Sequence, residues 1–183
     1  MKLACLLSNG FEDMEAVGTV AILRRSGIDV DYVSVDHQHE QTGYYKTTIK
    51  TEVMLSDVNV ERYDGLFIPG GAQSSKLRVN QAVLDLVMAF HRHQKWLFAI
   101  CAGPTVLGVL GLLEHKEYTA FPNTDGFMKK GIRIPAPVVQ SQNIITGAAA
   151  GAVYEFAFKI IEVLQGNETA KTVKERILYR QFE

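Results

Sequence analysis

Short, continuously apolar runs alternate with longer amphipathic segments along most of this chain, and this alternation constrains the fold more than any other feature. Apolar runs of strand length lie at residues 3–7, 65–69 and 96–100, and a further strand is predicted at the mostly apolar stretch 30–35. Strands that are apolar on both faces have to be covered on both faces, which is typical of a parallel sheet with helices on each side. The sequence therefore predicts an α/β fold with a mostly parallel central sheet. Ligands of such sheets bind where the strands end, at the carboxyl edge.

The segments between these runs carry helix and turn signals. Helices are predicted at residues 12–26, 80–93, 104–113, 155–165 and 169–178. Gly27 follows the first helix, as glycine often does, and Asn80 is a suitable N-cap for the second. The polar stretch 42–55 predicts a hairpin or edge strands, and short strands are predicted near residues 118–120, 138–140 and 144–146. No repeat, low-complexity tract or linker interrupts the pattern, so we expect a single domain over residues 1–183.

Composition and charge exclude several classes of protein. Hydrophobic residues make up 47% of the chain and charged residues 21%, which excludes a disordered chain. The net charge of -1 provides no basic field for nucleic acid. No apolar stretch approaches a membrane span, and the apolar start is cut short at Ser8, so we interpret it as a buried strand and not as a signal peptide. Cys5 and Cys101 form no disulfide framework, so we expect a reducing, cytoplasmic environment.

One cysteine lies where a buried strand passes directly into a helix, in the motif Ala99-Ile100-Cys101-Ala102-Gly103-Pro104. Small residues flank Cys101, and Pro104 suits a first helical turn. This is the pattern of a nucleophile elbow with cysteine in place of serine. The free N–H groups and partial positive charge of a helix start favour a thiolate, so we expect a lowered thiol pKa for Cys101. A buried, unreactive cysteine is the alternative that this motif alone leaves open.

Two further motifs are predicted to reach the same edge of the sheet. Gly70 and Gly71 follow the run at 65–69, and two glycines let backbone N–H groups face an oxyanion, although a simple tight turn has the same pattern. Glu12, Asp13 and Glu15 open the first helix, where acidic residues complement the helix dipole. Small apolar residues follow Glu15, so we expect its carboxyl to face inward. A nearby thiolate would keep that carboxyl protonated, able to donate a hydrogen bond and transfer a proton.

Together these motifs resemble the ThiJ/PfpI superfamily, and most closely its branch that contains the parkinsonism-associated protein deglycase. The matching segments, which extend over nearly the whole chain, are Gly10-Phe11-Glu12-Asp13-Met14-Glu15, Leu23-Arg24-Arg25-Ser26-Gly27-Ile28, Pro69-Gly70-Gly71, Ala99-Ile100-Cys101-Ala102-Gly103-Pro104 and Tyr154-Glu155-Phe156-Ala157. The resemblance implies a flavodoxin-like three-layer sandwich and a homodimer. It implies no cofactor, and no cluster of ligating side chains in the sequence predicts a metal site.

The resemblance also implies roles for individual residues. Cys101 would be the nucleophile and the easily oxidised residue. Glu15 would be its protonated hydrogen-bond partner, and Gly70, Gly71 and Ala102 would supply N–H groups around the reacting oxygen.

The sequence departs from the family pattern at two places. Some members carry a histidine shortly after the nucleophile helix, where this chain has Phe121. His91 and His93 end a predicted helix and His37 lies in a polar loop, so neither a cysteine–histidine protease dyad nor amidotransferase chemistry is expected. Closer relatives often carry Gly-Pro-Gly near the partner subunit's site, where this chain has Ala149-Ala150-Gly151. This second departure leaves the shape of the pocket, and with it the substrate, open.

Two functions of different classes use the same residues. In the first, a stress-response enzyme, Cys101 attacks the aldehyde of methylglyoxal or of its adducts on protein side chains, and Glu15 moves protons while a hemithioacetal rearranges and is hydrolysed to a hydroxy acid. In the second, a non-enzymatic redox sensor or chaperone, Cys101 is oxidised to a sulfinate. A role in thiamine biosynthesis or nucleotide binding is not favoured, because the sequence has no phosphate-binding loop.

Overall fold

Seven strands form the central sheet of the computed structural model, which describes residues 1–181. In sheet order they are β10 (Val138–Ser141), β11 (Ile144–Gly147), β7 (Trp96–Ile100), β6 (Gly65–Ile68), β1 (Lys2–Leu7), β2 (Asp29–Ser34) and β5 (Val53–Met54). Neighbouring strands are parallel except at one edge, where β10 runs antiparallel to β11. The predicted α/β fold with a mostly parallel sheet is confirmed.

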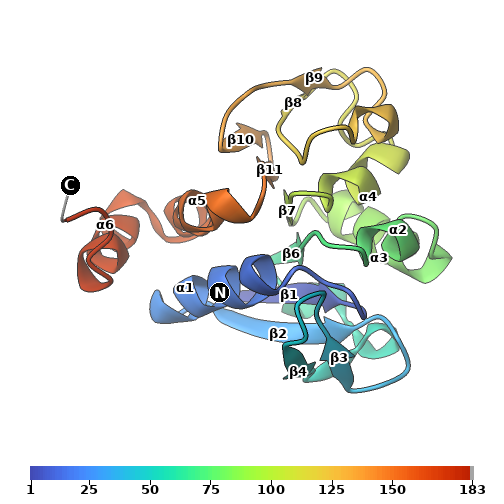
Figure 1. Ribbon diagram of the computed structural model, residues 1–183, viewed down its shortest axis with the longest axis horizontal. Coiled ribbons are helices and arrows are strands. Elements are labelled where there is room, and N and C mark those ends of the chain that lie inside the picture. The colour runs from blue at the N-terminus through green and yellow to red at the C-terminus, as the bar shows by residue number, and fades with distance from the viewer. Residues whose placement is uncertain (182–183) are drawn as a thin grey trace.

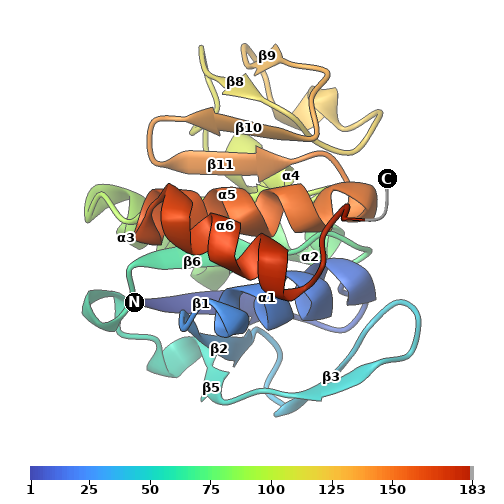
Figure 2. The ribbon, with the colours of Figure 1, turned by 90° about the vertical axis from the view of Figure 1, so that its left-hand side faces the viewer.

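Helices cover both faces of the sheet, as Figures 1 and 2 show. One layer contains α1 (Thr19–Arg25), α5 (Val153–Gln165) and α6 (Asn167–Arg176), and the other contains α2 (Ser74–Leu77), α3 (Gln81–Arg92) and α4 (Pro104–Val109). Side chains of β1 alternate between the two cores: Cys5 packs with the first layer and Leu6 with the second. Both are fully buried, which explains why the strand is apolar at every position from Leu3 to Leu7.

Short strands and helical turns lie at the edges of the sandwich. The stretch predicted as a hairpin or edge strands forms both, because β3 (Glu40–Thr42) pairs with β4 (Thr48–Lys50) and β5 joins the central sheet. The predicted strand near 118–120 is β8 (Glu117–Tyr118), which pairs with β9 (Ile132–Arg133) outside the central sheet. Single turns of 3-10 helix lie at Leu55–Asp57, Val60–Arg62, Asp125–Phe127 and Ala150–Ala152.

The first helix differs from its prediction at its beginning. A π-helical turn, η1 (Met14–Gly18), precedes α1. The segment predicted as one regular helix over residues 12–26 therefore contains a π-helical part followed by an α-helical part. π-Helical turns inside helices are rare and occur often at functional sites. The predicted end is confirmed, because Gly27 has a φ of 87° and its N–H bonds to the carbonyl of Arg24.

Other helix limits also differ. The predicted helix 104–113 ends at Val109, because the backbone turns at Gly111, whose φ is 72° and whose N–H donates to the Gly108 carbonyl. Helix α5 begins at Val153, two residues before its prediction, and the short helix α2 was not predicted. The N-cap of α3 is Asn80, as predicted, since its side chain accepts the N–H groups of Ala82 and Val83.

The strand order places three loops side by side. After β1 the chain builds one half of the sheet through β2 and β5, and then returns to the other side of β1 as β6, followed by β7. The carboxyl ends of β1, β6 and β7 are therefore neighbours at the point where the strand order reverses, which is where open α/β sheets bind ligands. The loop after β1 touches the loop after β6 through a β-bridge between Phe11 and Gly71. Within residues 1–181, no helix is long and apolar enough to cross a membrane.

Candidate active site

Cys101 occupies a strained position directly after β7. Its φ is 63°, in the left-handed region that residues with a side chain seldom adopt. Two backbone hydrogen bonds hold this conformation. The Cys101 N–H donates to the carbonyl of Gly147 (2.9 Å), and the Cys101 carbonyl accepts from the N–H of Phe121 (2.8 Å). Helix α4 begins three residues later at Pro104. This sharp, strained strand-to-helix turn has the form of a nucleophile elbow.

Two glycines make the close packing around this turn possible. A Cβ at Gly103 would lie 2.3 Å from the carbonyl oxygen of Ile68, which no side chain tolerates. A Cβ at Gly70 would lie 2.7 Å from both the Cys101 Cβ and the Glu15 Oε2. The space between the carboxyl of Glu15 and the side chain of Cys101 therefore admits only a glycine backbone at position 70.

Glu15 brings a fully buried carboxyl to this turn from the π-helical segment η1. Its Oε2 accepts the N–H of Gly70 at 2.7 Å, and its own N–H donates to the carboxylate of Glu12 at 2.7 Å. Burial raises the pKa of Glu15 to about 7, opposed by its hydrogen bonds with the Cys101 thiol and the Gly70 N–H and aided by the charge of Glu12. The carboxyl therefore gains and loses its proton near neutral pH.

The groups around the Cys101 sulfur shift the pKa of its thiol in opposite directions. Burial raises the pKa of the Cys101 thiol, and the charge of the Glu15 carboxylate raises it further. The N–H groups of Ala102 and Gly71 lower it. The balance is a raised thiol pKa, so the lowered pKa expected from the helix start alone is wrong: only 9% of Cys101 is exposed, and a carboxylate lies beside it.

Glu15 and Cys101 consequently titrate as a pair. Two negative charges in one buried site are unfavourable, so over a range of pH the pair holds a single proton. Moving that proton between oxygen and sulfur converts thiol and carboxylate into thiolate and carboxylic acid. The arrangement can therefore deliver a nucleophile and a proton donor in one step.

All five residues that the sequence singled out lie together here, but their N–H groups are used differently. Gly71 and Ala102 direct their N–H groups at the sulfur of Cys101. The N–H of Gly70 instead donates to Glu15, so it is not free to face a reacting oxygen as expected. Gly70 thus fixes the carboxyl, while the other two N–H groups surround the sulfur.

Sequence reasoning missed the residues that hold the site loops in place. Asp13, interpreted only as a helix-start acid, accepts the N–H groups of Tyr45 (2.8 Å) and Thr47 (2.9 Å) and so attaches the β3–β4 hairpin to η1. Gln73 was not singled out, although its side chain is fully buried between the loops after β1 and β6. Their partners are distant in sequence, so no local signal identifies them.

Two of the histidines make contacts elsewhere in the molecule. The His39 ring pairs with the carbonyl of Thr51, and the His93 ring contacts the carbonyl of Ala89 and the carboxylate of Glu61. Within residues 1–181, the groups that act on the Cys101 thiol are Glu15, Ala102 and Gly71, and none is an imidazole. Over the same residues, no group of three or more His, Cys, Asp or Glu side chains is placed to hold a metal ion.

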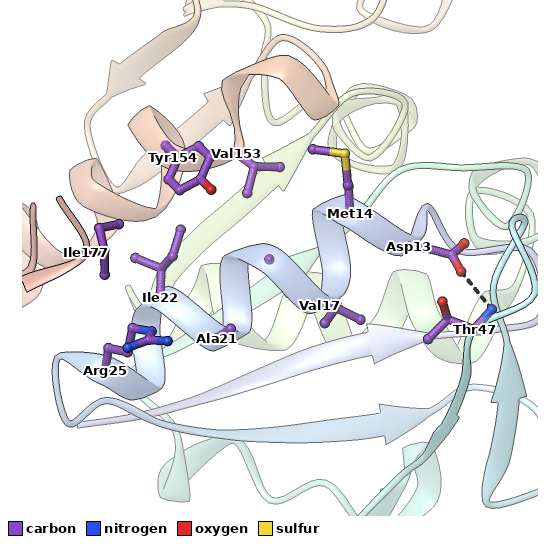
Figure 3. A pocket seen from close by; sticks show the side chains of 11 residues that line it. Asp13, Met14, Val17, Ala21, Ile22, Arg25, Thr47, Val153, Tyr154 and Ile177 are labelled. Carbon is purple, nitrogen blue, oxygen red and sulfur yellow. Dashed lines mark hydrogen bonds between the residues drawn. The ribbon is translucent and has the colours of Figure 1, made fainter. Parts of the chain in front are cut away.

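An apolar groove of about 540 Å³ lies beside the site, along η1, α1 and the start of α5 (Figure 3). Met14, Val17 and Tyr154 line it and are 55%, 39% and 45% exposed. Val20, on the same helix, is buried in the core and does not line the groove. Cys101 does not line this groove, which is therefore separate from the reacting sulfur.

Comparison with known proteins was made for the sequence and for the fold. The model of the DJ-1/PfpI family matches residues 1–163. Protein DJ-1 homolog A of Arabidopsis thaliana is 31% identical over 95% of this chain, and the match spans 45% of that longer protein. A glutathione-independent glyoxalase of Caenorhabditis elegans is 30% identical over 88% of this chain and 87% of its own length. A deglycase of Pyrococcus horikoshii is 26% identical over 90% of this chain and all of its own length.

The fold has close counterparts among solved structures. The structure of oxidised DJ-1 from Toxoplasma gondii superposes with a TM-score of 0.92, at 30% identity, and covers 98% of both chains. The flavodoxin-like sandwich predicted from the sequence is therefore the fold of this chain.

Proposed function

Because this chain belongs to the DJ-1/PfpI family, we propose that it is a cysteine-dependent enzyme acting on reactive carbonyl compounds, with Cys101 as nucleophile and Glu15 as the proton-transferring group. The observation that carries the proposal is the buried Glu15–Cys101 pair at a strained elbow, with a carboxyl pKa raised to about 7. Similar proteins named as a glyoxalase and a deglycase support the carbonyl class of substrate.

The proposed reaction converts a 2-oxoaldehyde such as methylglyoxal, or its adduct on a protein side chain, into a 2-hydroxy acid. The thiolate sulfur forms a bond to the aldehyde carbon, and the carbonyl oxygen takes the proton held by Glu15, giving a hemithioacetal. With an adduct the same carbon–sulfur bond forms while the bond to the side-chain heteroatom breaks, and that heteroatom leaves with the proton held by Glu15. The Glu15 carboxylate then removes the proton on that carbon and the neighbouring carbonyl oxygen takes a proton, giving an enediol; return of a proton to the neighbouring carbon and loss of the hydroxyl proton from the sulfur-bearing carbon give a thioester. Water hydrolyses the thioester, releases the hydroxy acid and restores the thiol.

Redox sensing is the second candidate, and one observation favours it. The N–H groups of Gly71 and Ala102 both reach the Cys101 sulfur, where they would also stabilise the oxygens of a sulfinate formed by peroxide. The two functions differ in their products. Formation of hydroxy acid from methylglyoxal, compared between the wild-type protein and Cys101→Ser, tests the enzyme; peroxide oxidation without such turnover would favour the sensor.

We also propose that the protein is a homodimer in a reducing, cytoplasmic environment. The exposed apolar side chains of Met14, Val17 and Tyr154 around the groove in Figure 3 support a subunit contact there. Cys5 and Cys101 are both free thiols, as expected for a reducing compartment.

A further inference from the structure

A glutamine side chain bridges the two loops that carry the site. Gln73 lies just before α2 and is fully buried. Its Oε1 accepts the N–H of Ser8 at 2.7 Å, and its Nε2 donates to the carbonyl of Pro69 at 3.0 Å. Its backbone N–H donates to the carbonyl of Gly10 at 3.1 Å. One residue therefore connects the loop that follows β1 with the loop that follows β6.

Both loops lead directly to reacting groups. The loop after β1 continues into η1, which carries Glu15, and Pro69 is followed by Gly70, whose N–H binds the Glu15 carboxyl. The two loops are also joined by backbone hydrogen bonds, such as the one from the Glu12 N–H to the Gly70 carbonyl at 3.2 Å. The Gln73 side chain adds two hydrogen bonds to this connection, and so contributes to the position of the carboxyl relative to Gly70.

We propose that Gln73 is a positioning residue for the proton transfer assigned to Glu15, an inference that rests on the proposed function. A buried primary amide offers a donor and an acceptor at once, and this site requires both, because the Ser8 N–H needs an acceptor and the Pro69 carbonyl needs a donor. An apolar side chain of the same size satisfies neither. An ionised carboxylate satisfies only Ser8 and places a negative charge against the carbonyl.

The chain contains a matched control in Gln41, on β3. Its side chain is also fully buried, and its Nε2 donates to the Ser34 hydroxyl and to the Gln38 carbonyl, both at 2.9 Å. It has no contact with either site loop in these bonds. Gln73→Met and Gln41→Met are nearly isosteric changes that remove comparable buried hydrogen bonds, so both cost stability, but only Gln73→Met removes side-chain hydrogen bonds to the loops around Glu15.

The test is the pH dependence of Cys101 alkylation by iodoacetamide, which requires no carbonyl turnover. Cys5 is fully buried in β1, and labelling is followed by mass mapping to assign it to Cys101. In the wild-type protein the first rise in rate should lie near pH 7, because loss of the first proton leaves one proton shared between the Glu15 carboxyl and the sulfur, and a fraction of the pair is then thiolate. In Gln73→Met, loosened loops admit water, and burial is the main cause of the raised Glu15 pKa. The midpoint should fall by about one unit or more, and methylglyoxal turnover by roughly tenfold or more.

Gln73→Glu provides a conservative rescue that a merely structural role would not predict. As a carboxylic acid it can still donate and accept, so at pH 5.5 its alkylation rate should match that of the wild-type protein. At pH 8.5, once ionised, it should be alkylated at the rate of Gln73→Met and not at that of the wild-type protein. The proposal would be overturned by an unchanged midpoint in folded Gln73→Met, or by an equal shift of the midpoint in Gln41→Met. It would also be overturned if Gln73→Glu were alkylated at the wild-type rate at both pH values. Absence of methylglyoxal turnover in the wild-type protein, with the midpoint shift present, would contradict the proposed function and not the role of Gln73.

Discussion

The protonation states of Glu15 and Cys101 are coupled, so the two side chains have to be considered together. Considered alone, a buried carboxyl would have a raised pKa, and a thiol at a helix start would have a lowered one. Together they exclude a second negative charge, so the ionisation of one raises the pKa of the other. The chemistry therefore follows from the distance between two side chains that are far apart in the sequence.

Replacing Glu15 by glutamine separates hydrogen bonding from proton transfer. Glu15→Gln keeps the size of the side chain and offers a donor to the sulfur, but it cannot carry a transferable proton. Carbonyl-directed activity should fall by roughly 10²-fold or more, the usual scale for a lost acid–base group. Initial rates with methylglyoxal measure the effect. If the variant turns over like the wild-type protein, Glu15 has only a packing role and the sensor gains support.

The raised pKa of Glu15 also makes stability depend on pH. The folded carboxyl has a pKa of about 7 against 4.5 for the ordinary group, so the folded state binds the proton more tightly. This contribution is fully present below pH 4.5 and is lost as pH rises through about 7, with a total of about 3 kcal/mol. The difference in unfolding free energy between the wild-type protein and Glu15→Gln, from urea titrations, should therefore fall between pH 4.5 and 8. A constant difference across this range would contradict the raised pKa.

At the residue scale, local sequence identified residues that lie together at the candidate site, but not the direction of the Cys101 pKa shift. Cys101 follows an apolar strand and precedes a proline, and Gly70 and Gly71 end the neighbouring strand, so these positions could be predicted from motifs and strand ends. The raised thiol pKa could not, because it depends on burial and on Glu15 brought in from another element. The use of the Gly70 N–H by Glu15 is equally non-local.

At the scale of elements, the apolar strands were predicted well and the helix ends less well. A strand that is buried on both faces carries its signal in every residue, whereas a helix end depends on a few backbone angles such as the φ of Gly111. The π-helical turn η1 has no sequence signature that separates it from an α-helix. Yet it is this turn that carries Glu15 to the site and presents Asp13 to the hairpin.

The contact between Asp13 and the β3–β4 hairpin predicts an effect on local opening. Asp13→Ala removes the acceptor of the Tyr45 and Thr47 N–H groups, so these amides should exchange with solvent about tenfold faster or more. Hydrogen exchange followed by NMR measures this directly. The amide of Cys5 in β1 serves as an internal control and should not change. Unaltered protection of Tyr45 and Thr47 would mean that the hairpin is held by its other contacts alone.

At the scale of the whole molecule, the reversal of strand order between β1 and β6 gathers the site from three separate loops. The alternation of strands and helices sufficed to predict that such an edge exists. The groove along η1 and α1 could not be located from sequence, because the pattern of apolar residues does not distinguish Val20, which faces the core, from Val17, which faces solvent. The exposed side of the helix is known only once α5 is placed beside it.

The proposed subunit contact is tested by disrupting the groove. Light scattering should give about twice the 20.3 kDa chain mass for the wild-type protein. Val17→Asp places a charge in the apolar groove and should yield monomers at micromolar concentration. Val79→Asp is the control, since Val79 is apolar and 76% exposed but does not line the groove. A monomeric wild-type protein, or a dimer that survives Val17→Asp, would exclude this surface.

The central claim is that the strained, buried Cys101 is a nucleophile for carbonyl compounds. Its most direct test is the conversion of methylglyoxal to lactate, followed by NMR, with wild-type protein and with Cys101→Ser at equal concentration. We expect steady lactate formation by the wild-type protein, and a loss of at least 10³-fold in the serine variant, because a serine hydroxyl beside Glu15 is a far weaker nucleophile. Equal lactate formation by the two proteins, or none by the wild-type protein, would contradict the claim.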